Sequence, residues 1–181
     1  MPVGIIYHPI YLQHDTGAHP ERAERLTAVM GAVEKTDLRD LTVRLEPRPA
    51  TIEEITAVHT AQHVTEVRGV ASQGGGYLDL DTVVSARSYD AALMAAGGAI
   101  VGAEAVVMGE ARYTFAFVRP PGHHAGRDYG AGFCLFNNVA IAARYLQKNL
   151  AIQRVLIVDF DVHHGNGTQD VFYDDSSVLY F

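Results

Sequence analysis

Residues 155–170 read VLIVDFDVHHGNGTQD, an apolar run that ends in two aspartates and two histidines and then a glycine-rich turn. The apolar part, 154–161, predicts a strand buried on both faces. Asp159, Asp161 and His163 alternate, so in an extended backbone their side chains point the same way. Asp161 and His163 offer an oxygen and an imidazole nitrogen, a common zinc ligand pair. A glycine-rich turn with capping aspartates and incidental histidines is the alternative.

A second polar cluster follows another apolar run. Residues 113–126 read YTFAFVRPPGHHAG, a predicted strand that leads into His123 and His124. In open α/β sheets, sites form beyond the carboxyl ends of the strands, so the two clusters meet if their strands are parallel neighbours. Adjacent histidines suit proton transfer to and from a metal-bound water, and each needs an orienting partner. Asp159 and Asn166 are the candidates, while the alternative is a pair of satisfied polar loop residues.

Strands and helices alternate along the rest of the chain. Residues 51–71 begin with a capping box, Thr51 with Glu54, and predict two short helices that break near Thr60. Residues 72–82 are interpreted as a loop. The remaining predicted strands are 4–8, 41–49 (an edge strand) and 177–181, and the remaining helices are 19–36, 85–109, 135–149 and 166–175. This order predicts one α/β domain, residues 1–181, with a mostly parallel sheet in a three-layer sandwich.

Composition excludes several classes of protein. The chain has 181 residues, a net charge of -7 and no basic stripe, so we expect no nucleic-acid partner. The most apolar stretch, 91–109, is rich in glycine and contains Glu104, which favours a buried helix over a membrane span. The start has no charged n-region with a long apolar run, so we expect no signal peptide. The lone Cys134, interpreted as a small buried hydrophobe, fits a reducing, cytoplasmic location.

Three motifs together carry a family resemblance. The stretches RPPGHHAGRDYGAGFCLFNNVAIAA, VLIVDFDVHHGNGTQDVFY and HPERAERL resemble the histone deacetylase family, which includes acetylpolyamine amidohydrolases and acetoin-utilisation proteins. The resemblance implies an arginase-like α/β fold and a zinc-dependent hydrolase. The implied substrates are acetyl-lysine in peptides or proteins and acetylated polyamines, both cationic classes that suit an acidic chain. The Asn of HHGNGTQ resembles class II enzymes and many bacterial members.

The resemblance also implies residue roles. Asp161 and His163 would be two of three zinc ligands. His124 would be the general base and then the general acid, with His123 as its electrostatic partner. The implied orienting pairs are Asp159 with His123 and Asn166 with His124.

Substrate and cation sites follow in the same way. Gly132 and Phe133 would line a narrow acyl-lysine tunnel, Arg25 would lie at its inner end, and Asp81 would hold substrate backbone at the rim. A structural monovalent cation, K+, is also implied. Its two sites would use Asp159, Asp161 and His163, and Phe172, Asp175 and Val178.

Two parts of the family's site have no matching position in this chain. They are an aspartate that completes the zinc ligands and a tyrosine that donates to the oxyanion, and both would lie beyond Phe181. We therefore expect a truncated domain with exposed apolar surface at its sheet edge. Three interpretations stay open: a piece of a complete deacetylase, a catalytically incomplete half-domain that binds partners or metal, and a half-domain completed by another chain, as in a homo-oligomer.

His59 and His63 form one further pattern. They stand four residues apart on a predicted helix, a spacing that can bind a metal. A solvated or packed helix face is the favoured interpretation.

Overall fold

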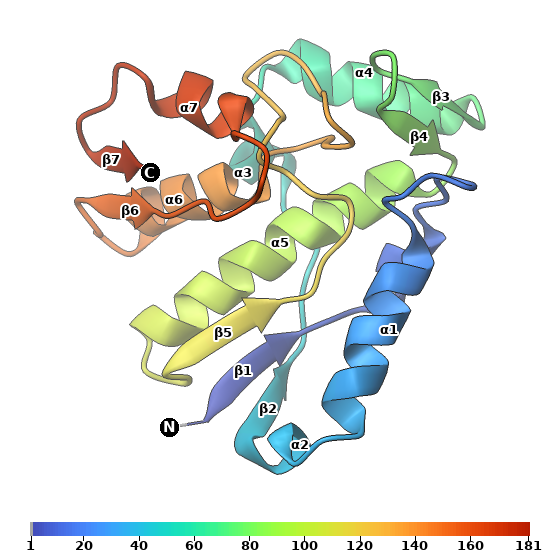
Figure 1. Cartoon of the computed structure of the whole chain (residues 1–181). Coiled ribbons are helices and arrows are strands. Elements are labelled where there is room, and N and C mark those ends of the chain that lie inside the picture. The colour runs from blue at the N-terminus through green and yellow to red at the C-terminus, as the bar shows by residue number, and fades with distance from the viewer. Residues whose placement is uncertain (1) are drawn as a thin grey trace.

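Parallel strands form the framework of the domain. We describe it from a computed structural model, which describes residues 2–181 and their side chains except that of Arg39. The strands are β1 (Val3–Ile6), β2 (Thr42–Leu45), β3 (Gly75–Tyr77), β4 (Val83–Ser85), β5 (Tyr113–Ala116), β6 (Val155–Ile157) and β7 (Val178–Tyr180). β2, β1 and β5 form one parallel sheet in that order, β6 and β7 form a parallel pair, and β3 and β4 form an antiparallel hairpin (Figure 1).

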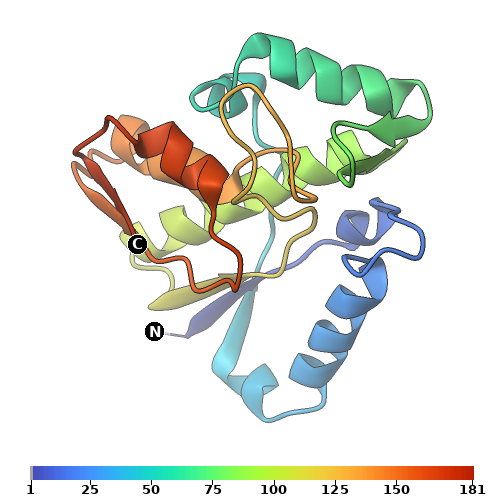
Figure 2. The ribbon, with the colours of Figure 1, turned by 45° about the horizontal axis from the view of Figure 1, so that its top comes forward.

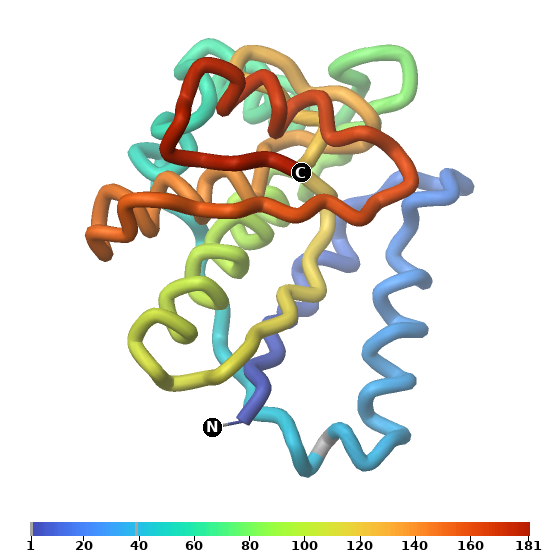
Figure 3. Tube along the Cα trace, turned by 60° about the vertical axis from the view of Figure 1, so that its left-hand side comes forward, coloured from blue at the N-terminus to red at the C-terminus, as the bar shows by residue number. Residues whose placement is uncertain are grey.

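Helices cover these strands. They are the short 3-10 helix η1 (Pro9–Gln13) and the α-helices α1 (Ala23–Glu34), α2 (Leu38–Leu41), α3 (Ile52–Thr56), α4 (Ala61–Ser72), α5 (Ser88–Val107), α6 (Asn138–Asn149) and α7 (Asn166–Phe172). α5 and α1 lie on opposite sides of the three-stranded sheet (Figure 3). Alternation along β1 explains this arrangement, because Ile6 packs toward α5 while Ile5 faces Met30 of α1. The predicted α/β architecture of layered helices and parallel strands is thus confirmed.

α5 is the central helix of the core. Its small residues let other backbone approach closely: a Cβ on Gly97 would lie 1.7 Å from the carbonyl oxygen of Arg48. Among described helices it alone is long and apolar enough, by length and composition, to cross a membrane. It packs against β1, β5 and α6, and ten of its twenty residues are buried. The predicted buried helix is confirmed.

Local signals located most element boundaries. The Thr51–Glu54 capping box opens α3, and Thr60 caps α4 by accepting a hydrogen bond from the His63 amide, so the predicted break is confirmed. β2 is an edge strand, as predicted. The prediction of a loop over 72–82 was wrong at Gly75–Tyr77, because these residues form β3, which pairs with β4 in a hairpin and whose glycines hide the strand pattern.

The prediction that 154–161 is a strand buried on both faces was also wrong. Only Val155–Ile157 forms a strand; Ile157 is buried and Val155 packs partly buried against the core, while Leu156 is exposed. α6 and α7 lie with the β6–β7 pair to one side of the molecule, apart from the three-stranded sheet (Figure 2). The other face of the pair has no described element packed on it, so apolar side chains are exposed there, as expected for an apolar sheet edge. The most exposed are Leu156, Val158, Phe160, Leu179 and Phe181.

Candidate active site

The two polar clusters meet, although their strands are not hydrogen-bonded neighbours. His123 follows β5 and Asp159 follows β6, which lie in different sheets. The connection runs through the first turn of α7, where the Thr168 amide donates to the His123 carbonyl oxygen at 3.0 Å. A Cβ on Gly167 would lie 2.4 Å from the carbonyl oxygen of Ala125. Glycine is therefore required where α7 crosses the histidine loop.

His123 is paired with a carboxylate. Its Nδ1 lies 2.8 Å from Oδ2 of Asp159, which also accepts a hydrogen bond from the hydroxyl of Tyr180 at 3.0 Å. Burial opposes the charged form of Asp159, but hydrogen bonds from His123, the Asp161 amide and Tyr180 outweigh it and lower its pKa. Asp159 is therefore ionised at neutral pH, and the shared proton resides on His123 Nδ1.

His124 is paired with an amide instead. Its Nδ1 lies 2.6 Å from Oδ1 of Asn166, and the Asn166 Nδ2 group donates to the hydroxyl of Tyr129 at 3.2 Å. The rings of His123 and His124 are 4.1 Å apart between centroids, so the two imidazoles are direct neighbours. The structure brings together both of the pairs that the family resemblance implies.

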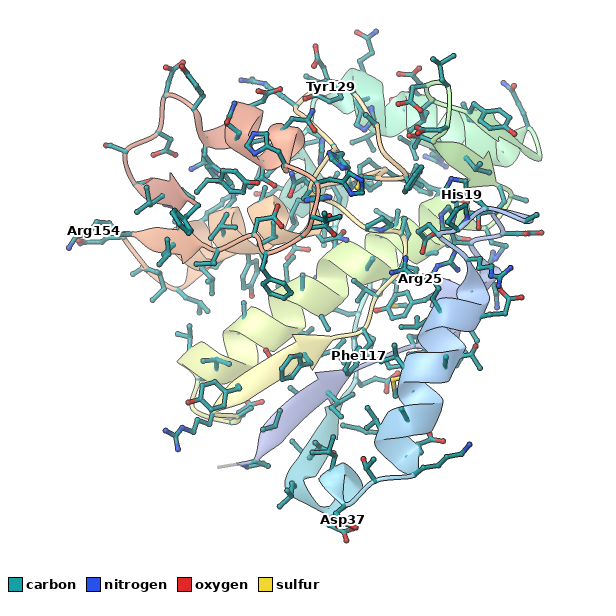
Figure 4. All side chains as sticks on the ribbon, viewed as in Figure 1. His19, Arg25, Asp37, Phe117, Tyr129 and Arg154 are labelled. Carbon is teal, nitrogen blue, oxygen red and sulfur yellow. The ribbon has the colours of Figure 1, made fainter. Side chains whose placement is uncertain are left out.

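Both histidines line one cavity of about 600 Å³. Gly132, Phe133 and Arg25, the predicted tunnel residues, line it as well. Arg25 comes from the first turn of α1 (Figure 4). The remaining lining residues are Pro20, Glu21, Leu26, Val29, Val118, Arg119, Pro121, Asp161, Val162 and His163.

Asp161 and His163 lie beside each other at the mouth of this cavity. Asp161 Oδ1 is 3.2 Å from His163 Nδ1 and also accepts the His163 amide at 2.8 Å. That amide hydrogen bond is the main cause of a lowered pKa for Asp161, which is a carboxylate at neutral pH. Two tetrahedral zinc ligands are separated by roughly 3.4 Å, so this donor pair fits zinc. Within residues 2–181, no group of three or more His, Cys, Asp or Glu side chains could hold a metal.

Gly132 and Phe133 form a sharp bend in the cavity wall. Both have left-handed backbone, with φ of 53° and 71°. A Cβ on Gly132 would lie 2.3 Å from Cδ2 of His124, so the glycine makes room for that ring. Phe133 packs edge-on against His19 at 4.2 Å between centroids, and its amide donates to Thr82 Oγ1 at 3.1 Å. Backbone strain is thus placed directly beside a candidate catalytic group.

Asp81 is placed differently from the other predicted substrate residues. It is exposed in the turn between β3 and β4, where its amide donates to Asp79, and it does not line the cavity. Its neighbour Thr82 holds the backbone of Phe133. Asp81 therefore lies next to the segment that shapes the wall, and its contact with a substrate stays a prediction.

The residues predicted for a second cation site gather at the α7–β7 turn. The carbonyl oxygens of Phe172 and Asp175 accept the amides of Asp175 and Val178, at 3.0 and 3.2 Å. Arg144 pairs with the Asp175 carboxylate and lies over the Phe172 ring. Hydrogen bonds from Ser177 and Arg144 lower the Asp175 pKa to about 2. The cation itself stays a prediction.

One supporting cluster was not predicted from the sequence. Arg119 precedes the histidine loop and forms a buried, bidentate ion pair with Glu21, from Nε to Oε1 at 2.5 Å and from Nη2 to Oε2 at 2.8 Å. Its Nη1 donates to the carbonyl oxygens of Tyr11 and His14, both at 3.0 Å. This cluster joins the end of β5 to the segment that carries Arg25. No local spacing could reveal it, because Glu21 and Arg119 are 98 residues apart.

His59 and His63 are packed rather than metal-binding. Both are buried, and each uses Nε2 for backbone: His59 accepts the Asn137 amide at 2.9 Å, and His63 meets the Leu135 carbonyl oxygen at 2.8 Å. Burial, and then the charge of His63, lowers the His59 pKa to about 3. The packed interpretation is confirmed. Cys134 is also buried as predicted, and burial raises its pKa to about 12.

Comparison with known proteins identifies the family. The family model for the histone deacetylase domain matches residues 19–181. A probable deacetylase of Methanothermobacter thermautotrophicus is 43% identical over 97% of this chain, which covers 52% of that protein. Human histone deacetylase 9 is 40% identical over 98% of this chain, which covers 20% of that protein.

A solved structure gives the same result. The crystal structure of the HDA15 HD domain matches with a TM-score of 0.95 and 37% identity, over 99% of this chain and 52% of that chain. The chain therefore spans about half the length of the archaeal relative and of the solved domain. The family match across most of the chain, together with the shared fold, shows that this chain belongs to the histone deacetylase domain family.

Proposed function

We propose that this chain serves the zinc-dependent hydrolysis of the acetyl amide in N-acetyl-lysine of proteins or in acetylated polyamines, with release of acetate, in the cytoplasm. One observation carries the proposal: two neighbouring imidazoles with different partners line the same cavity as the Asp161–His163 donor pair. Such an arrangement provides both proton transfer and metal binding at one point.

Asp161 and His163 would hold the zinc ion. Their donor atoms are already close together, and both side chains are half or more exposed, at 50% and 72%. Zinc bound there supplies Lewis-acid activation of the acetyl carbonyl and of water. We also propose that the carbonyl groups of Asp159, Asp161 and His163, and those at the α7–β7 turn, bind a structural K+.

The two histidines have different roles in the proposed reaction. Asp159 is ionised, so it stabilises a positive charge on His123. Asn166 is neutral and stabilises a positive charge on His124 less strongly. In this proposal His124 takes the proton of the attacking water at Nε2 and returns it to the leaving amine. His123, hydrogen-bonded to the Asp159 carboxylate, is the electrostatic partner beside it.

The cavity suits a long cationic amine that carries an acetyl group. Phe133 and Leu26 supply apolar wall for a methylene chain, and the bend at Gly132 keeps the wall close to His124. The net charge of -7 favours the approach of positively charged substrates. Acetylated lysine and acetylated polyamines share both properties, so both belong in the assay.

Acetate release tests the proposal. The chain is loaded with zinc and given an acetyl-lysine peptide or an acetylpolyamine, with a chelator in a parallel sample. His124→Ala should abolish release. His164→Ala is the matched control, because the His164 side chain belongs to the neighbouring histidine pair but hydrogen-bonds to Gln169 and does not line the cavity. Chelator-resistant release, or release that survives His124→Ala, would contradict the proposal.

A second candidate function is a binding module without turnover, or a half-site completed by another chain. It is favoured by the metal donors, because the described residues contain no group of three or more His, Cys, Asp or Glu side chains that could hold a metal. Catalytic zinc sites ordinarily use three protein ligands and water. Binding of a hydroxamate or acetyl-lysine peptide with no acetate release would favour the module. Release that depends on the square of the protein concentration would favour completion by a second copy.

A further inference from the structure

Tyr129 connects the His124–Asn166 pair to a carboxylate on the surface. Its hydroxyl donates to Oδ2 of Asp170 at 2.6 Å and accepts a hydrogen bond from Nδ2 of Asn166 at 3.2 Å. Tyr129 comes from the loop beside α7 (Figure 4). The four side chains form one continuous line, from His124 through Asn166 and Tyr129 to Asp170.

The carboxylate of Asp170, at the surface end of this line, determines which group donates and which accepts in every hydrogen bond of the line. A carboxylate can only accept, so the single hydroxyl proton of Tyr129 points to Asp170. The Tyr129 oxygen must then accept from its other neighbour, and in Asn166 only Nδ2 can donate. The amide of Asn166 is therefore held with Oδ1 toward His124.

The same logic determines the proton position on His124. Because Oδ1 of Asn166 is an acceptor, Nδ1 of His124 must be the donor in their 2.6 Å hydrogen bond. A neutral imidazole carries only one proton, which leaves Nε2 with a free lone pair. A base that accepts a proton at Nε2 needs this tautomer and no other.

We infer that Tyr129 is a positioning residue that sets the tautomer of His124 by holding the Asn166 amide in one orientation. The inference rests on the proposed function for its catalytic meaning, but the tautomer itself is a property of the folded chain. Asn166 is neutral and nearly symmetric in shape, so nothing in its own structure prefers one orientation. A carboxylate at this position would accept in either orientation and would need no such support.

Tyr129 is held firmly enough for this role. A Cβ on Gly126 would lie 2.2 Å from Cε1 of Tyr129, so the ring rests on bare backbone at that glycine. The Gly126 amide donates to the Tyr129 carbonyl oxygen at 3.0 Å. Partial burial, and then the hydrogen bond to Asp170, raises the Tyr129 pKa to about 12, which keeps the hydroxyl protonated.

The test reads the tautomer directly. The metal-free chain is labelled with ¹⁵N-histidine and studied by NMR at a pH well above the ordinary histidine pKa of about 6.5. A nitrogen that bears the proton and one that does not have well-separated shifts, and the signals missing from His124→Gln identify His124. We expect Nδ1–H alone in the native chain. Tyr129→Phe should add the Nε2–H form in a comparable amount, because Asn166 can then turn and donate to Nδ1.

Asp170→Asn is the second variant, since an amide can donate to Tyr129 and removes the constraint on direction. Tyr173→Phe and Asp174→Asn are the matched controls. They make the same chemical changes at exposed positions whose side chains have no hydrogen bond within the described part of the chain. Both controls should retain the native tautomer.

Three results would overturn the inference: Nε2–H in the native chain, Nδ1–H alone in Tyr129→Phe, or a control that shifts the tautomer as far as Tyr129→Phe does. In the acetate assay, Tyr129→Phe should lose about 10- to 100-fold in activity, as is usual for residues that orient a catalytic group. If the chain releases no acetate but the tautomer responds as expected, the proposed function fails and the positioning role of Tyr129 stands.

Discussion

Nδ1 of His123 and Oδ2 of Asp159 are 2.8 Å apart, although the strands that precede them belong to different sheets. The pair depends on loop and helix contacts rather than on a shared sheet edge. The hydroxyl of Tyr180 adds a second donor to the same oxygen. Asp159 thereby connects the histidine loop, the segment after β6 and the strand β7.

Asp159→Asn tests the role of this carboxylate. The amide can still accept a hydrogen bond from His123, but it no longer balances a positive charge on the imidazole. We expect about a 10- to 100-fold loss of acetate release with little change in thermal stability. Asp174→Asn, an exposed carboxylate near the end of α7, is the matched control and should retain full activity. Equal activities of the two variants would contradict the role of Asp159.

Gly132→Ala tests the shape of the cavity wall. Its φ of 53° disfavours any side chain, and its Cβ would lie 2.3 Å from the His124 ring. We expect the ring to move, with a large loss of acetate release and a decrease of about 1–2 kcal/mol in the free energy of unfolding. NMR signals of His124 report the movement without turnover.

Gly31→Ala is the control for that variant. Gly31 lies inside α1, and no other side chain or loop comes within 4 Å of the place that an alanine methyl group would occupy. We expect a gain of about 0.5–1 kcal/mol in the free energy of unfolding, because alanine is the better helix former. If Gly132→Ala were as well tolerated as Gly31→Ala, the wall would not constrain His124.

The sequence allowed prediction of the site where its signals were local. His123 and His124 stand in one motif, Asp159 and Asn166 in another, and the structure places both pairs within hydrogen-bond distance. The contact between the motifs followed from the general placement of sites at strand ends. The contacts that bring the two motifs together were not predictable, because α7 rather than a shared sheet edge joins the two loops.

Non-local interactions could not be predicted. Tyr129 reaches Asn166 across 37 residues, and no tyrosine spacing distinguishes it from a rim residue. The apolar run over 154–161 indicated a strand but not which of its faces would be covered, so the burial of Leu156 and Val158 was wrongly predicted. The pattern of apolar residues in a sequence indicates which side chains tend to be buried. Whether they are buried depends on which elements pack against the strand.

Because two buried histidines have lowered pKa values, we expect the free energy of unfolding to depend on pH. Burial, and then Arg119, lowers the His14 pKa to about 4, and burial lowers that of His59 to about 3. Below about pH 6.5 the unfolded chain binds protons that the folded chain does not. Stability should therefore be highest above that pH and fall as the pH decreases toward 4, by at most about 1.4 kcal/mol per pH unit for each histidine.

Urea denaturation from pH 7 to pH 5 measures this slope. The variants His14→Gln and His59→Gln each remove one of the groups, so each should flatten the slope even where it lowers stability overall. The comparison uses the slope and not the absolute free energy, because both side chains also make hydrogen bonds. An unchanged slope in both variants would show that these histidines are protonated equally in the folded and unfolded chain.

Because the Arg119–Glu21 ion pair is buried, we expect a single substitution in it to lower the stability of the fold strongly. Glu21→Gln removes one charge and leaves the Arg119 guanidinium buried without a counterion. Arg119 is 3% exposed, so water cannot replace the lost carboxylate. We expect a loss of about 3–5 kcal/mol in the free energy of unfolding, measured by urea denaturation.

Glu34→Gln is the matched control for this change. Glu34 bonds to Arg44 at 3.0 Å, but both side chains are 60% or more exposed. Solvent screens such a pair, so we expect a change within about 1 kcal/mol. The two variants make the same substitution in the same kind of ion pair and differ in burial. If they had equal effects, the Arg119–Glu21 pair would not be what joins the end of β5 to α1, and the position of Arg25 in the cavity would need another support.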